Sequence, residues 1–204
     1  MKMAILNILS ILMLGCFLTA CAQNNSTLVN TWKDPEYTTQ KCAKVLVVGI
    51  NENLGRRMSF EDEFTHVLKS GGIDALQSYL VIKWGPGLTL ANVVAAVKSA
   101  GADCVITTRL VNLQEEKRLV PGYEAFMIAY PEMDITPGGP SVASIEITVT
   151  KATVETRLFD AGTAKMVWAT GGVGYDFYNL VKPEPLIKDY ARNIFKVLKK
   201  EGLF

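Results

Sequence analysis

The chain has 204 residues, and its 21 Lys and Arg residues nearly balance 20 Asp and Glu residues, for a formal net charge of +1. A charge this close to zero argues against a nucleic-acid-binding surface, which needs a basic excess, and against electrostatic capture of strongly charged substrates. The length and the ordinary globular composition suit one domain with a full hydrophobic core.

The first 20 residues are typical of a secretion signal. Lys2 is followed by an apolar run whose only polar members are Asn7, Ser10 and Thr19, which is the order of a charged and then an apolar region in such signals. The run is near the lower length limit for crossing a bilayer, so a retained membrane helix is an alternative. The run ends at residues 18–21, Leu-Thr-Ala-Cys, with small residues before a cysteine.

This ending resembles the lipobox of bacterial lipoproteins, in which the cysteine receives a diacylglyceryl group and the signal is cut just before it. The resemblance implies that Cys21 is the lipidated first residue of the mature chain. Cys16 is a second candidate, but Met13 stands where the family prefers Leu. An ordinary cleaved signal remains the alternative to lipidation.

Several acyl chains together anchor a protein stably to a membrane. The resemblance therefore implies a domain held in the bacterial cell envelope through Cys21 and facing the periplasm. In enteric lipoproteins an Asp directly after the lipidated cysteine favours retention in the inner membrane. Here that position is Ala22, so we expect the outer membrane. We expect a signal at residues 1–20, a polar flexible tether at 21–31, and one α/β domain at 32–204 with a Pro- and Gly-rich insertion at about 121–142.

Two cysteines remain for the domain, Cys42 and Cys104. Each lies just before or at the start of an apolar run, at residues 45–50 and 105–113. If these runs are adjacent parallel strands, the two cysteines lie at the same end of the sheet and can bond in an oxidising compartment. Such a bridge would stabilise the fold by roughly 4 kcal/mol. Two buried free thiols are the alternative, and without a CxxC spacing neither a redox motif nor a zinc site is indicated.

The first half of the domain alternates strand and helix patterns. The β-branched run at 45–50 predicts a central strand covered on both faces. Ser59 is a candidate N-cap for a helix with one apolar face that ends at Gly71. Residues 73–82 predict a second strand.

A second helix is expected from Thr89 to Gly101, followed by a third strand over residues 104–113. Alternating strands and helices imply right-handed crossovers and a sheet with helices packed on it.

The segment after a charged run at residues 115–118 holds four prolines and three glycines between residues 121 and 140. A long loop without regular structure is usually functional or disordered. Its aromatic and Met residues suit a partner contact, and a flap folded onto its own sheet is the alternative. The candidate contact residues are Tyr123, Phe126, Met127, Tyr130 and Met133.

The last third predicts an antiparallel hairpin and a helix. Apolar residues alternate over 145–149 and continue on the opposite parity from Ala152, which predicts a bulge near Thr150 and Lys151. Residues 160–163 form a turn by composition, a return strand covers 165–170, and three glycines predict a loop over one sheet end at residues 171–178. A final amphipathic helix runs from about Pro183 to Glu201.

The predicted fold class is therefore α/β: a mixed five-stranded sheet, made of three βα-linked strands plus an antiparallel hairpin, packed with three helices.

The sequence shows no catalytic constellation. The single histidine, His66, lies off the apolar helix face beside Asp62, which is typical of a surface residue. No serine triad, P-loop or metal-ligand spacing is present, so we expect no cofactor and no metal. Arg56 and Arg57 at a helix start offer only a weak anion site. We therefore predict a protein that is not an enzyme.

The order of residues 32–35 (Trp-Lys-Asp-Pro), 45–49, 60–61 (Phe-Glu), 101–103 and 158–168 is similar to a group of small bacterial envelope lipoproteins of uncharacterised function. In topology the domain is similar in outline to the amino-terminal domain of TolB. Our leading hypothesis is a membrane-anchored, non-catalytic binding or assembly module that contacts other envelope proteins through residues 121–140 or an exposed sheet edge.

Two alternatives stay open. One is a small-ligand carrier or sensor with a pocket near residues 51–57 and 171–178. The other is an enzyme of unrecognised type.

Overall fold

A computed structural model describes residues 30–38, 41–82, 88–130, 143–171, 173–178 and 183–204. The predicted signal, both lipidation candidates, Cys16 and Cys21, and the predicted contact residue Met133 therefore lie outside the described residues.

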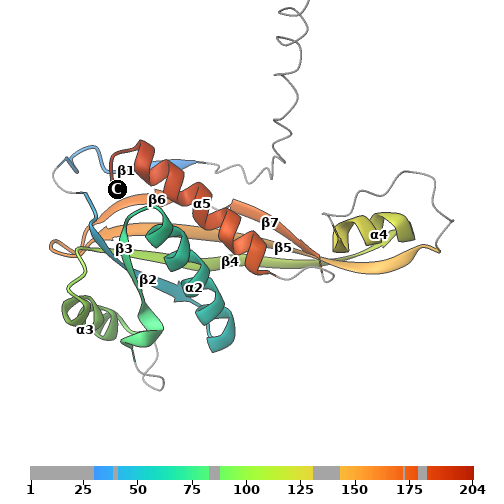
Figure 1. The fold of residues 1–204 in the computed structure, drawn as a ribbon, viewed down its shortest axis with the longest axis horizontal. Coiled ribbons are helices and arrows are strands. Elements are labelled where there is room, and N and C mark those ends of the chain that lie inside the picture. The colour runs from blue at the N-terminus through green and yellow to red at the C-terminus, as the bar shows by residue number, and fades with distance from the viewer. Residues whose placement is uncertain (1–29, 39–40, 83–87, 131–142, 172, 179–182) are drawn as a thin grey trace, which may run out of the picture.

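One mixed sheet organises the domain (Figure 1). Six strands lie side by side in the order β1 (Thr31–Lys33), β6 (Met166–Thr170), β5 (Ile145–Asp160), β4 (Cys104–Val120), β2 (Lys44–Ile50) and β3 (Asp74–Gln77). A seventh strand, β7 (Val173–Tyr178), pairs with β5. β2 is parallel to both of its neighbours, β3 and β4, and the other pairs are antiparallel.

The mixed α/β class is confirmed, but the predicted count of five strands is too low. The short edge strand β1 has only three residues, too few to show a strand pattern in the sequence. The glycine-containing segment after β6 was predicted to be a loop, and it instead forms β7 along β5.

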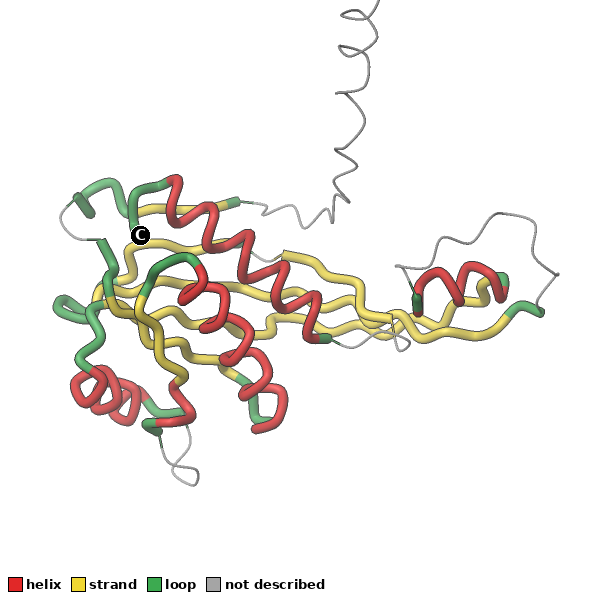
Figure 2. Tube along the Cα trace, in the orientation of Figure 1, coloured by secondary structure: helices red, strands yellow, loops and turns green. Residues whose placement is uncertain are grey.

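Helices cover both faces of the sheet. α2 (Leu54–Ser70) and α5 (Glu184–Lys200) share a core with Leu158 and Trp168 on one face. α3 (Leu90–Ala100) packs with Leu46 and Val48 on the other face. The fourth described α-helix, α4 (Gly122–Ala129), lies apart from this body (Figure 2), and it is the one missing from the predicted three.

The unbroken apolar run of β2 reflects the burial of both faces of this strand. Val45 and Val47 belong to the core under α2 and α5, whereas Leu46 and Val48 belong to the core under α3. All four side chains are at most 1% exposed. The predicted central strand, covered on both faces, is therefore confirmed.

The predicted start of α2 at Ser59 is wrong. The helix begins at Leu54, because the Asn53 side chain accepts a hydrogen bond from the Arg56 backbone N–H at 3.0 Å and caps it. Its end at Gly71 is confirmed, and a Cβ there would lie 2.2 Å from the Phe195 ring of α5, so a larger residue would have to displace that ring.

The predicted second strand over 73–82 is too long. β3 stops at Gln77, and residues Ser78–Leu80 form a 3₁₀ turn. The reason is Glu61, whose buried carboxylate accepts hydrogen bonds from the Ser78 hydroxyl at 2.7 Å and the Tyr79 backbone N–H at 2.9 Å. By contrast, α3 has its predicted limits, with a Thr89 cap and Gly101 in the left-handed region at φ 62°.

β4 is longer than predicted. It continues past Leu113 to Val120, so the charged residues 115–118 belong to a strand and not to a loop. The predicted bulge at Thr150 and Lys151 is also wrong, because both pair with β4 in regular register. The irregularity instead falls between Leu110 and Asn112 of β4.

The change of parity in β5 reflects a change of covered face. Ile147 and Val149 face a small core formed with α4, whereas Val154 and Leu158 face the main core under α2 and α5. Successive residues of a strand point to opposite faces, so odd- and even-numbered residues lie on different faces. A strand covered on different faces in its two halves therefore shows a parity shift without a bulge.

Candidate functional site

The two longest strands continue beyond the body as an arm, which we define as residues 110–130 and 145–149. β2 pairs with β4 only as far as Arg109, and past that point β4 and β5 run on together to the region of α4 (Figure 1). β7 follows β5 only from Val154 to Val149. β7 therefore flanks the base of the arm, and beyond Glu116 and Val149 the arm is a two-stranded ribbon that carries a helix.

α4 is fixed to the arm by a small separate core. Val120, Ala125, Ile147 and Val149 are buried there, at most 3% exposed, and Ile128 packs against them. The Pro121 carbonyl accepts hydrogen bonds from the backbone N–H groups of residues 124 and 125 and so starts the helix. One side of α4 is therefore used for attachment to the strands.

The other side of α4 carries exposed apolar residues, which we call the outer face of α4. Tyr123 is 65% exposed, Phe126 38%, Met127 39% and Tyr130 46%. The rings of Phe126 and Tyr130 lie 4.9 Å apart. Four of the five predicted contact residues thus gather on one helix, although the sequence predicted no regular structure there.

Ion pairs compensate the charges of the arm. Lys117 Nζ lies 2.8 Å from Glu146 Oε1, and Glu116 pairs with Lys151 at 2.9 Å and with Arg118 at 3.7 Å. The hydrogen bond and charge of Lys151 lower the pKa of the Glu116 carboxyl. The hydrogen bond and charge of Glu146 raise the pKa of Lys117. The arm therefore offers apolar contact and backbone groups more than net charge.

A cavity of about 510 Å³ lies where the arm meets the body. The start of α2, the middle of β4 and β5, and the start of α5 form its walls. Its apolar lining consists of Ile50, Phe60, Leu110, Leu113, Ala152, Val154 and Ile187, with Arg56, Arg109 and Glu115 among its charged lining residues. This cavity adjoins residues 51–57, where the sequence predicted a ligand pocket.

Arg57 is not available for the predicted anion site. It is 6% exposed, and its Nε donates to Glu61 Oε1 at 2.8 Å. Its guanidinium also donates to the Ser78 hydroxyl at 2.6 Å, and Glu61 accepts a further bond from the Gly49 backbone N–H at 2.9 Å. This buried pair is a structural centre that ties α2 to β2 and to the 3₁₀ turn.

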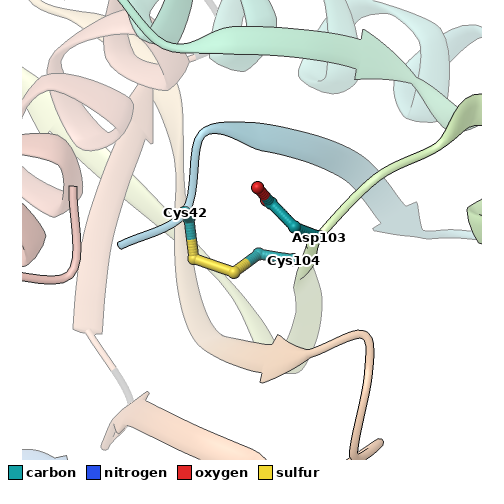
Figure 3. A group of neighbouring side chains, drawn as sticks. All are labelled: Cys42, Asp103 and Cys104. Carbon is teal, nitrogen blue, oxygen red and sulfur yellow. A yellow bond between two sulfur atoms is a disulfide. The ribbon is translucent and has the colours of Figure 1, made fainter. Parts of the chain in front are cut away.

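The two domain cysteines lie at the start of β4 and just before β2, at the end of these strands opposite the arm, and Figure 3 shows them bonded to each other. β2 and β4 are adjacent and parallel, and the structure joins Cys42 to Cys104 by a disulfide with a Cα–Cα distance of 5.6 Å. Asp103 lies beside the two sulfurs, all within 4.8 Å of one another. Three such donors could hold a metal ion only if the thiols were free.

The structure uses these donors in another way. The two Asp103 carboxylate oxygens accept hydrogen bonds at 3.0 Å from the backbone N–H groups of Ala43 and Lys44. Cys42 donates its backbone N–H to the Leu203 carbonyl at 2.8 Å. The cluster thus fastens the start of β2 to β4 and to the last turn of the chain.

His66 is exposed on α2, as predicted. Asp62, its expected neighbour, instead accepts hydrogen bonds from the Tyr79 hydroxyl at 2.6 Å and from Gln77 Nε2 at 2.9 Å. The Asp62 hydrogen bond, with burial and nearby negative charge, raises the pKa of Tyr79 to about 12. Nothing in the helical spacing could reveal this contact, because Tyr79 comes from the 3₁₀ turn.

None of the helices in the described residues has the length and apolar composition needed to span a bilayer.

No protein-family model and no curated protein matches the chain. Solved structures that it resembles include the PelC dodecamer from Paraburkholderia phytofirmans, 15% identical, covering 83% of this chain and 94% of that chain with a TM-score of 0.45. Lipoprotein GNA1162 from Neisseria meningitidis is 13% identical, covering 78% and 99% with a TM-score of 0.45. A minor lipoprotein from Acinetobacter baumannii is 8% identical, covering 78% and 94% with a TM-score of 0.37. No function follows from likenesses of this size.

Proposed function

We propose that the protein is a lipid-anchored envelope lipoprotein that acts as a non-catalytic binding module. The contact surface is the outer face of α4, which meets another envelope protein. The observation that best supports this contact surface is that four large apolar side chains are exposed together on a helix set apart from the body. A soluble domain rarely exposes such a cluster unless it serves a contact, and aromatic and Met residues are enriched at protein interfaces.

The anchor in this proposal is Cys21. Its support is the lipobox-like ending of the apolar run and the polar residues that follow it. The domain would then stand on the periplasmic side of a membrane, with the outer membrane as the expected one. The topological likeness to the amino-terminal domain of TolB stays a prediction.

In-cell photo-crosslinking tests the contact surface. A photoreactive phenylalanine analogue replaces Met127 in the full chain, and a matched variant carries it at Lys196, which is exposed on α5. We expect irradiation to join a discrete envelope protein to the Met127 variant and none to the Lys196 variant. Substituting Ala at Tyr123 and Tyr130 should then remove most of that product.

Equal capture at both positions would contradict a specific contact on the outer face of α4. Absence of capture at Met127, in cells where the chain reaches its normal level, would contradict the proposal as well.

A second candidate function is a carrier or sensor of a small amphipathic molecule. The observation that favours it is the cavity of about 510 Å³, which has apolar walls and nearby arginines. A volume of this size falls in the range of small-molecule pockets. Its ligand would combine an apolar body with a polar or anionic group.

A further inference from the structure

Among the strands that the structure describes, β4 has an open edge along the arm. From Cys104 to Arg109, β4 lies between β2 and β5, but beyond Arg109 the described strands pair with it on the β5 side alone. Every residue from 109 to 119 is exposed. An unpaired edge presents a row of backbone N–H and C=O groups that can pair with another strand.

The usual protections against such pairing are limited here. Natural edges are kept short or are protected by bulges, prolines or charged side chains, and of these the stretch Asn112–Val120 has only the charges at residues 115–118. The irregularity between Leu110 and Asn112 lies at the body end, and from Asn112 to Val120 the pairing with β5 runs without a shift. This stretch is longer than a typical strand of about five or six residues.

The order of the charges on this edge makes one copy of the strand complementary to a second, antiparallel copy. Glu115 and Glu116 are followed directly by Lys117 and Arg118. An antiparallel copy of the same strand runs in the opposite direction, so its Lys117 can lie opposite Glu115. Opposite charges across a strand pair stabilise it, whereas like charges weaken it.

We propose that a second copy of this chain pairs with this edge through its own β4, antiparallel, over residues 112–120. A two-fold axis perpendicular to the sheet would relate the two copies. Glu116 then lies opposite the partner's Glu116, Glu115 faces the partner's Lys117, and Leu113 faces the partner's Leu119.

Symmetry and side-chain chemistry select this register. A two-fold axis perpendicular to the sheet keeps the same face of both copies on one side, so facing residues are both even-numbered or both odd-numbered. The proposed register gives two Glu–Lys pairs and brings together Leu113, 45% exposed, and Leu119, 71% exposed. The central Glu116 carboxylates keep Lys151 and Arg118 of their own chains as cationic neighbours.

This pairing goes beyond the proposed function and is independent of it. It uses the edge of β4, whereas the envelope partner would contact the outer face of α4. Substitutions on α4 should therefore leave the pairing intact. The two proposals can fail separately.

Cysteine crosslinking tests the register. In the full chain, solubilised from membranes in mild detergent and oxidised, Glu116→Cys should give a reducible band at twice the chain mass. Directly opposed Cα atoms in antiparallel strands lie about 4.5–5.5 Å apart, within disulfide range. The control Gln114→Cys lies on the same face, but its copies would be about 13 Å apart, so it should give no such band.

A charge exchange tests the chemistry. In the Glu116→Cys chain, adding Glu115→Lys sets Lys against the partner's Lys117, and we expect pairing about tenfold weaker. Adding Lys117→Glu to that variant restores two opposite-charge pairs and should restore the crosslink. A crosslinked fraction unchanged by Glu115→Lys, or equal crosslinking at residues 114 and 116, would overturn the proposal.

A third measurement needs no substitution. A mixture of ¹⁴N- and ¹⁵N-labelled wild-type chains is treated with a carbodiimide, which joins a carboxylate to an amine in direct contact. We expect a Glu115–Lys117 product between light and heavy peptides. If only same-label products form, or if the edge is joined to a different protein, a second copy is not the occupant.

Discussion

At the scale of single residues, the Glu61 carboxylate joins α2 to β2 and to the 3₁₀ turn. It is fully buried, and it accepts from Arg57 and Ser78 and from the backbone of Gly49 and Tyr79. From sequence, Arg57 and Glu61 are an i,i+4 pair of the kind that usually lies on a helix surface. Only the packing of the 3₁₀ turn over them makes the pair internal, so sequence spacing could not identify it.

Removing this carboxylate should destabilise the fold strongly. We expect Glu61→Ala to lower the free energy of unfolding by about 3–5 kcal/mol, because the Arg57 charge would stay buried without its partner. Urea unfolding of the purified chain measures the loss. The control is Asp74→Ala, which breaks an exposed pair with Lys44 and should cost about 1 kcal/mol or less.

The double variant Arg57→Met with Glu61→Leu removes both buried charges and should recover part of the lost stability. Equal losses for Glu61→Ala and Asp74→Ala would show that the buried pair has no such role.

At the scale of elements, sequence pattern was reliable where one environment covers a whole element. β2, α3 and α5 have the predicted positions, because each keeps the same covered face or faces along its length. Pattern failed in β5, where the covered face changes from α4 to the main core. It also failed around α4, where prolines and glycines suggested a loop although an eight-residue helix lies between them.

The cavity between β4, β5, α2 and α5 makes the carrier hypothesis testable. Ala152 lines this cavity and is 4% exposed. If the cavity holds a ligand, native mass spectrometry of the chain purified from its cells should show a small bound molecule. We expect Ala152→Phe, which fills the space, to remove it, and the exposed control Val111→Phe to retain it. A wild-type chain without any bound mass would count against a carrier.

At the scale of the whole molecule, the candidate site could be predicted only in part. The residues Tyr123, Phe126, Met127 and Tyr130 were identified from their type within a Pro- and Gly-rich segment. Their common face on α4, and the arm that carries this helix, could not be predicted, because the charged residues 115–118 indicated that the strand had already ended. The open β4 edge follows from pairings between segments far apart in sequence, which no local pattern contains.

The proposed anchor acts on the molecule as a whole and has a direct test. Cys21→Ser should abolish incorporation of labelled fatty acid and release the domain from the membrane fraction, because the thiol that receives the lipid is gone. Cys16→Ser is the matched control and should leave labelling unchanged. Labelling that survives Cys21→Ser but not Cys16→Ser would move the anchor to Cys16.

The arm and the disulfide together define how the molecule would bear mechanical load. A pull on α4 along the arm enters β4 near Val120 and runs down the strand to Cys104, where the disulfide joins it to the segment before β2. Along the way the force is parallel to the strands, so the hydrogen bonds between β4 and β5 are loaded together in shear and not one after another. A tension applied at the tip would therefore reach a covalent bond at the far end of the sheet.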